Sequence, residues 1–308
     1  MKRRIFGLGA VVFFLCMLIA PKAVFSGASE GLLLWFQIVL PTLSPFLIIS
    51  NFLLISGNMR YITDALGSLF IRLFRVSEPG SYCVLVGFLC GYPMGAKTAA
   101  DMVQSKLISR EEGEYLLSFC NNTSPSFIMN YLVLKALHKE TLMLPTIGIL
   151  FLTPVLVSFI TRRKLPPQTG LHTHAPVSVS KSAWSLRDLD KCITDSAETL
   201  VKVGGYIILF SVLLSLLRTI PLQIFWFDYV LSFLEITNGI YILGNAALPF
   251  YIRYALLLGL TASGGLCSIA QTQCMIQDAH LPILPYITEK LAAALTASLL
   301  GILYLSLF

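Results

Sequence analysis

Uncharged apolar runs, separated by short polar stretches, follow one another along the whole chain. Most of them approach or exceed the roughly 20 residues that an α-helix needs to cross the hydrocarbon core of a bilayer. The pattern therefore predicts an all-α polytopic membrane protein. The predicted spans and hairpin arms cover residues 5–20, 31–59, 79–96, 115–134, 141–161, 196–218, 254–277 and 281–308.

Two of these runs are interrupted by turn-forming residues at corresponding places in the two halves. In each, an apolar arm leads to a Gly-containing tip and then to polar residues, which predicts a re-entrant helical hairpin. Small residues that let membrane helices pack closely are the alternative interpretation. The interruptions lie at 91–95 (GYPMG) and 263–265 (SGG).

The order of segments divides the chain into two similar halves, which we expect to be inverted repeats. Each half has a span, an interfacial amphipathic segment (60–75 and 221–235), an interrupted hairpin and a further span. Paired prolines, Pro41 and Pro45, are expected to kink or break the span at 31–59. The predicted units are an N-terminal span or signal anchor at 1–29, a first repeat at 30–161, a linker at 162–186 and a second repeat at 187–308.

Basic residues near the ends of the spans predict the orientation. Lys and Arg are enriched in cytosolic loops, and basic clusters lie at 2–4, 60–75 and 162–164. Two spans separate each cluster from the next, so all three fit the same side. We therefore expect the N-terminus, the linker and the C-terminus to lie in the cytosol.

Composition agrees with a membrane protein and excludes other classes. Of the 308 residues, 56% are hydrophobic and 12% are charged, against about 25% charged residues in a soluble domain. The net charge of +6 is read as an orientation signal, so no nucleic-acid partner is expected. The seven cysteines form no CxxC pair, and no nucleotide-binding or catalytic motif stands in a usable context. We expect no enzyme activity, no cofactor and no metal.

Three polar clusters lie where an ordinary membrane helix would avoid them: residues 97–101, residues 120–126, and residues 235–239 together with 263–273. Lys97 starts the polar arm after the first tip, where it either adds positive charge to a site or pairs with Asp101. Glu235 either faces a site or lies at the interface. The candidate substrate-binding residues are Gly91, Tyr92, Pro93, Gly95, Lys97, Thr98, Asn121, Asn122, Thr123, Ser124, Glu235, Thr237, Asn238, Ser263, Gly264, Gly265, Ser268 and Gln271.

Several of these blocks resemble a known family. The segments GYPMGAKT (91–98), SREEGE (109–114), CNNTSP (120–125), LEITNG (234–239) and SGGLCSIAQ (263–271) resemble the YlbJ (SpoVV) family of sporulation integral membrane proteins. These belong to the nucleoside-recognition Gate-domain proteins. The resemblance implies a fold related to concentrative nucleoside transporters, with two inverted repeats. It also implies a role in endospore formation, where the family is associated with moving dipicolinic acid from mother cell towards forespore.

Three functions remain open at this point. The favoured one is a transporter in the mother-cell-derived outer forespore membrane that binds a small planar anion, dipicolinate, between two hairpin tips. The second is a nucleoside or nucleobase carrier, and the third is a structural sporulation protein without transport. The lipid bilayer is the expected environment in each case, and the sequence leaves the oligomeric state open.

Overall fold

The computed structural model describes residues 2–56, 58, 61, 67–161, 185–220 and 226–307, and every regular element in these ranges is helical. This confirms the predicted all-α class. The elements are α1 (Lys2–Ile19), α2 (Pro21–Leu34), η1 (Trp35–Val39), α3 (Leu40–Ile55), α5 (Ser68–Phe74), α6 (Glu78–Leu89), α7 (Met94–Gln104), α8 (Arg110–Cys120), α9 (Pro125–Phe127), η3 (Ile128–Leu137), η4 (Glu140–Leu142), α10 (Met143–Thr161), α11 (Leu186–Arg218), α12 (Phe227–Leu231), α13 (Ile236–Gly244), α14 (Phe250–Ser263), α15 (Gly265–Ile276) and α16 (Ile283–Leu307).

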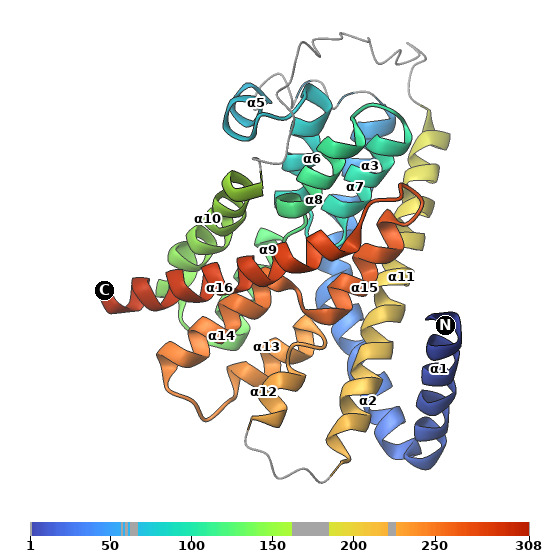
Figure 1. Ribbon diagram of the computed structural model, residues 1–308, viewed down its shortest axis with the longest axis vertical. Coiled ribbons are helices and arrows are strands. Elements are labelled where there is room, and N and C mark those ends of the chain that lie inside the picture. Colours follow the sequence, from blue (N-terminus) through green and yellow to red (C-terminus); the bar gives the residue numbers. More distant parts are fainter. Residues whose placement is uncertain are drawn as a thin grey trace.

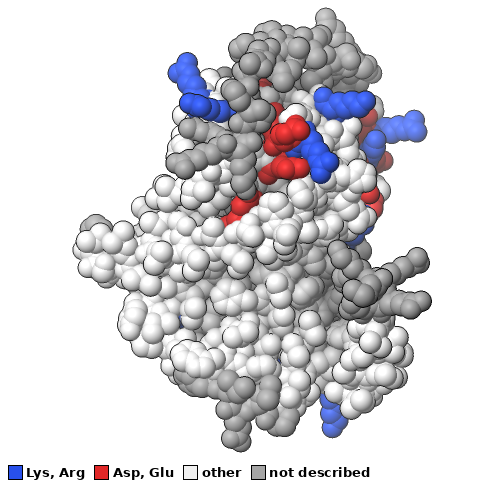
Figure 2. Space-filling model, in the orientation of Figure 1, with Lys and Arg blue, Asp and Glu red and all other residues white. Residues whose placement is uncertain are grey.

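Within the described ranges, five helical segments are long and apolar enough to cross a membrane. Charged side chains gather over the upper part of the face shown in Figure 2, and the broad zone below is nearly free of them. A zone nearly free of charged side chains suits the hydrocarbon core of a bilayer. The five segments are Pro21–Leu53, Glu140–Thr161, Leu186–Arg218, Phe250–Ile276 and Ile283–Leu307.

The long N-terminal segment does not break at its prolines. The chain passes from α2 to α3 through the π-helical η1, and Pro45 lies inside α3. Before it, α1 exposes apolar side chains such as Phe14 and Leu18. Of the expected interfacial segments, the structure describes α5 and α12. Residues 60, 62–66 and 221–225, and the linker over 162–184, lie outside the described residues.

In the first half, α6 and α7 pack side by side as a helical hairpin, and both pack on α8. Glycine makes this approach close. A Cβ on Gly87 of α6 or on Gly95 of α7 would overlap the carbonyl oxygen of Cys120, the last residue of α8. Serine caps set the helix starts, since Ser77 Oγ accepts the N–H of Gly80 and Ser109 Oγ accepts that of Glu112.

In the second half, α14 and α15 do not form the hairpin that the sequence predicts over 254–277. They lie end to end (Figure 1): α14 packs on α16, whereas α15 packs on α7 and α11. Phe250, where α14 begins, lies under the ammonium of Lys139, which follows η3. Leu281, after α15, lies against Gly113 in the first turn of α8. The pair therefore forms one bent crossing, antiparallel to the broken helix α8–η3, because Gly264 bends the chain without reversing it.

The last helix, α16, runs back along α14. The hydroxyl of Ser298 donates to the carbonyl of Ala255 at 2.8 Å, and Gly301 lies against Tyr254 and Leu258. The end of α16 therefore lies on the same side as the start of α14. This antiparallel contact carries the middle of α16 to the centre of the molecule, where the helix breaks meet.

Two apolar cores flank that centre. One is built mainly from α3, α6, α7, α8 and α11, with Leu47, Ala99 and Leu116 fully buried. The other is built from η3, α10, α13, α14 and α16, with Leu132, Leu258 and Ala297 fully buried. The polar residues of the broken helices lie between these two cores.

Substitution of Gly95 tests the close packing on α8. We expect Gly95→Ala to lower the thermal midpoint of the purified protein, because the new methyl group overlaps backbone that cannot rotate away. Gly148→Ala is the control, since nothing lies within 4 Å of a Cβ there and alanine favours a helix by about 0.5–1 kcal/mol. Equal midpoints for the two variants would contradict this packing.

The bent crossing of α14–α15 also changes the expected topology. Because it crosses once more than a hairpin would, we expect the C-terminus on the side opposite the linker. We would place single cysteines at Ser178 and Ser306 in a background without the seven native cysteines. Only one of the two should react with an impermeant thiol reagent in intact cells. Identical labelling of both positions would restore the orientation expected from the sequence.

Candidate functional site

The tip between α6 and α7 touches the break of the second half directly. Gly91 there has a φ of 86°, which glycine adopts without strain. The next residue, Tyr92, donates its hydroxyl to the carbonyl of Ala262 at 2.8 Å, and its ring lies against Gly264. Tyr92 therefore joins two breaks that are far apart in the sequence.

Asn121, where α8 ends, holds three further elements together and is fully buried. Its Oδ1 accepts the N–H of Ala96 on α7 at 3.3 Å. Its Nδ2 donates to the hydroxyls of Thr272 and Tyr286, each at 2.9 Å. Beyond it the chain is non-helical until Ser124 caps α9 by accepting the N–H of Phe127.

Glu235 is the buried N-cap of α13, with 1% of its surface exposed. Its carboxylate accepts the N–H groups of Thr237 and Asn238, the Thr237 hydroxyl and the Asn238 side-chain amide. Asn238 is fixed in turn by donating to Ser211 Oγ of α11 at 2.7 Å. Three of these four hydrogen bonds go to Oε2 and one to Oε1, so the carboxylate is held tightly at the start of α13.

The break between α14 and α15 lies against the chain that precedes α13. Gly264 and Gly265 have φ values of 78° and 72°. The freed N–H groups of Leu266 and Cys267 donate to the carbonyls of Phe233 and Leu234, both at 2.8 Å. The polar groups of this break thus find backbone partners across the fold.

These breaks enclose a cavity of about 50 Å³, room for roughly three or four water molecules. The structure brings together residues from both halves that lie up to 180 positions apart in the chain. Apolar residues of η1, α3 and α11 complete the wall. The candidate residues that line it are Gly91, Tyr92, Thr123, Ser124, Glu235, Thr237, Ser268 and Gln271.

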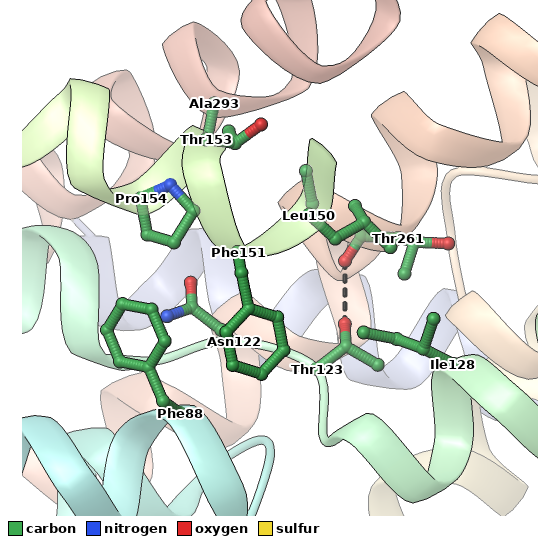
Figure 3. A pocket seen from close by; sticks show the side chains of 11 residues that line it. Phe88, Asn122, Thr123, Ile128, Leu150, Phe151, Thr153, Pro154, Thr261 and Ala293 are labelled. Atoms are coloured by element: carbon green, nitrogen blue, oxygen red, sulfur yellow. Dashed lines mark hydrogen bonds between the residues drawn. The ribbon is translucent and has the colours of Figure 1, made fainter. Parts of the chain in front are cut away.

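A second, smaller cavity of about 10 Å³ lies beside it. Figure 3 shows the side chain of Asn122 between Phe88 and Phe151, and the Thr123 hydroxyl bonded to the carbonyl of Thr261. That bond measures 2.7 Å. Thr123 lines both cavities, so it forms part of the partition between them.

The remaining candidate residues line neither cavity, apart from Asn122. Lys97 bonds the carboxylate of Asp101 at 2.9 Å, the pairing that the sequence left open as an alternative. Thr98 is buried within α7, and Ser263 donates to the carbonyl of Leu260. Pro93, Gly95, Asn238, Gly264 and Gly265 shape or hold the breaks instead of lining the space.

The central ionisable residue, Lys290 of α16, is absent from the sequence-based candidates. It is 2% exposed and donates to the carbonyl of Asn121, to Asn122 Oδ1 at 3.3 Å and to the Tyr92 hydroxyl at 3.2 Å. The signal was present, because a lysine inside an apolar span is a functional hypothesis by default. The high hydropathy of 281–308 predicts one uninterrupted membrane span, and Lys290 does not interrupt that pattern.

Glu235→Gln tests the carboxylate as a helix cap. The amide brings an NH₂ group to face donors, so we expect a loss of about 1–3 kcal/mol in stability and a lower thermal midpoint. Glu198→Gln is the matched control, because Glu198 is exposed and pairs only with Lys202 one helical turn away. Equal thermal midpoints for Glu235→Gln and Glu198→Gln would contradict a stabilising role of Glu235 as a helix cap.

Comparison with known proteins supplies one relative. The chain is 30% identical over 218 residues to the sporulation integral membrane protein YlbJ of Bacillus subtilis (strain 168). The match covers 66% of this chain and 53% of the relative, so the chain spans about half the length of the protein it matches. No protein-family model matches, and no solved structure gives a significant match. On the strength of the aligned region, the chain belongs to the YlbJ family of sporulation integral membrane proteins.

Proposed function

We propose that this protein is an integral membrane transporter of a small solute in endospore formation. The solute is dipicolinate, moved from mother cell towards forespore across the outer forespore membrane. The observation that carries the proposal is the meeting of interrupted helices from both halves around one cavity, joined by the bond from Tyr92 to Ala262. Interrupted helices in both halves of a membrane protein are the usual pointer to a transporter site.

The arrangement also supports the inverted repeats, with a changed correspondence. The hairpin α6–α7 and the broken helix α8–η3 of the first half correspond to α12–α13 and α14–α15 of the second. Gly87 and Gly95 meet the carbonyl of Cys120, and Gly239 of α13 meets the carbonyl of Ser232 in a similarly close approach. The second Gate-like hairpin is therefore placed around Glu235 and not around Gly264.

The small size of the cavity fits a transporter in a closed state. Room for a few water molecules is too little for an aromatic ring with two carboxylates, so the solute enters only after the halves move apart. Closure of a site around its solute is the usual way to exclude water. A purely structural protein would need neither the cavity nor polar breaks between its two cores.

The state of Glu235 favours an anion over a nucleoside. A nucleoside carrier would use this carboxylate to bind ribose hydroxyls, but the carboxylate already accepts four hydrogen bonds from α13. The negative charge is compensated where it lies, at the N-terminus of α13. It therefore repels a dianion less than an uncompensated carboxylate would.

Uptake by reconstituted vesicles tests the proposed transport. We expect the wild-type protein to move dipicolinate and not uridine, and Gly264→Val to lose at least about tenfold in rate, because valine is strained at a positive φ and meets the Tyr92 ring. Gly205→Val is the control, since nothing lies within 4 Å of a Cβ there. Uptake of uridine alone would favour the nucleoside carrier, and uptake of neither would favour the structural protein.

A further inference from the structure

Lys290 carries the one buried ammonium between the two cores of the described chain. We propose that this ammonium binds a carboxylate of the transported solute, which makes α16 a substrate-binding helix. The inference rests on the proposed function and names the group that recognises the anion. It begins from the position of Lys290 in the first half of α16 (Ile283–Leu307), a predominantly apolar candidate span in which it directly follows Glu289.

The hydrogen bonds of Lys290 all go to neutral acceptors. Its three N–H donors are directed at the Asn121 carbonyl, Asn122 Oδ1 and the Tyr92 hydroxyl. The rings of Tyr92 and Tyr286 lie 5.0 and 5.6 Å from the nitrogen. None of the ion pairs found in the described ranges includes Lys290. A carboxylate would be a stronger acceptor than any of these oxygens, because charge-assisted hydrogen bonds are about twice as strong as neutral ones.

The ammonium contacts residues that line the two cavities, although Lys290 itself lines neither of them. Tyr92, one of its acceptors, lines the larger cavity, and Asn122, another, lines the smaller one (Figure 3). Ala293, nearly one turn further along α16, also lines the smaller cavity. A single residue therefore separates each cavity from the donors of Lys290.

The other charged candidates are less suited to this role. Lys97 already has a carboxylate partner in Asp101, and its side chain is 24% exposed. Glu235 lines the larger cavity but carries a negative charge, which repels an anion. Among these charged residues, Lys290 is therefore the group that attracts a dianion, because the three hydrogen bonds named above go to neutral acceptors.

Ligand-induced thermal stabilisation of the purified full-length chain tests the inference. Dipicolinate should raise the thermal midpoint of the wild type, as any ligand of the folded state does. Lys290→Met should keep a folded protein but bind dipicolinate about 30-fold or more weakly, the usual order for removing one partner of a buried charge pair. Lys97→Met and Lys202→Met should respond nearly as the wild type does.

A neutral analogue gives a second measurement that needs no variant. Pyridine-2,6-dicarboxamide has nearly the shape of dipicolinate without its charge, so it should not stabilise the wild type. Equal stabilisation by the diamide, or a full response of Lys290→Met, would overturn the inference and leave transport intact. If Lys290→Met does not fold, the diamide comparison decides. A wild type that transports or binds no carboxylate at all refutes the proposed function, and this inference with it.

Discussion

A helix that breaks inside an apolar layer releases N–H and C=O groups that lipid cannot bind, and this constraint organises the centre of the molecule. The breaks satisfy one another: Leu266 and Cys267 donate to the carbonyls before α13, and Thr123 donates to Thr261. Each break is tolerated because another lies against it. The polar centre is consequently a single unit, and loss of one break would leave the groups of the next without partners.

The two buried charges at the centre, Glu235 and Lys290, each lie at the end of a helix. Glu235 lies at the N-terminus of α13, and Lys290 donates to the carbonyl that ends α8. A carboxylate is stabilised at the positive end of a helix, and an ammonium at the negative end. Neither charge needs the other, so the space between them is left for a third group.

The sequence predicted much of this architecture, and its failures have physical causes. Turn chemistry located the breaks at Gly91 and Gly264 correctly, because positive φ values favour glycine wherever they occur. The same chemistry does not say whether the chain reverses after the break. At Gly91 the arms pack side by side through Gly87 and Gly95 on α8, whereas α14 packs on α16 and leaves α15 to α7. Which surface a helix meets is a tertiary property that local spacing does not encode.

The sequence also predicted only part of the candidate site. The Asn121–Ser124 stretch was recognisable because polar residues interrupt an apolar run, and the structure places all four at or beside the two cavities. Lys290 carried a comparable signal, but it follows Glu289 near the start of the last span and no Gly-containing tip lies beside it. Lys97 follows a tip, yet Asp101 one turn away pairs with it. A charge with a partner at helical spacing is thus weak evidence for a binding site.

The hydrogen bonds of Lys290 connect the two halves of the chain. Lys290 is carried by α16, which packs along α14, whereas its acceptors Asn121, Asn122 and Tyr92 belong to the first half. Separation of the halves would strip the ammonium of its oxygens at membrane depth, where no water replaces them. These bonds therefore hold the two halves together at the centre, and breaking them is a free-energy cost of any separation of the halves there.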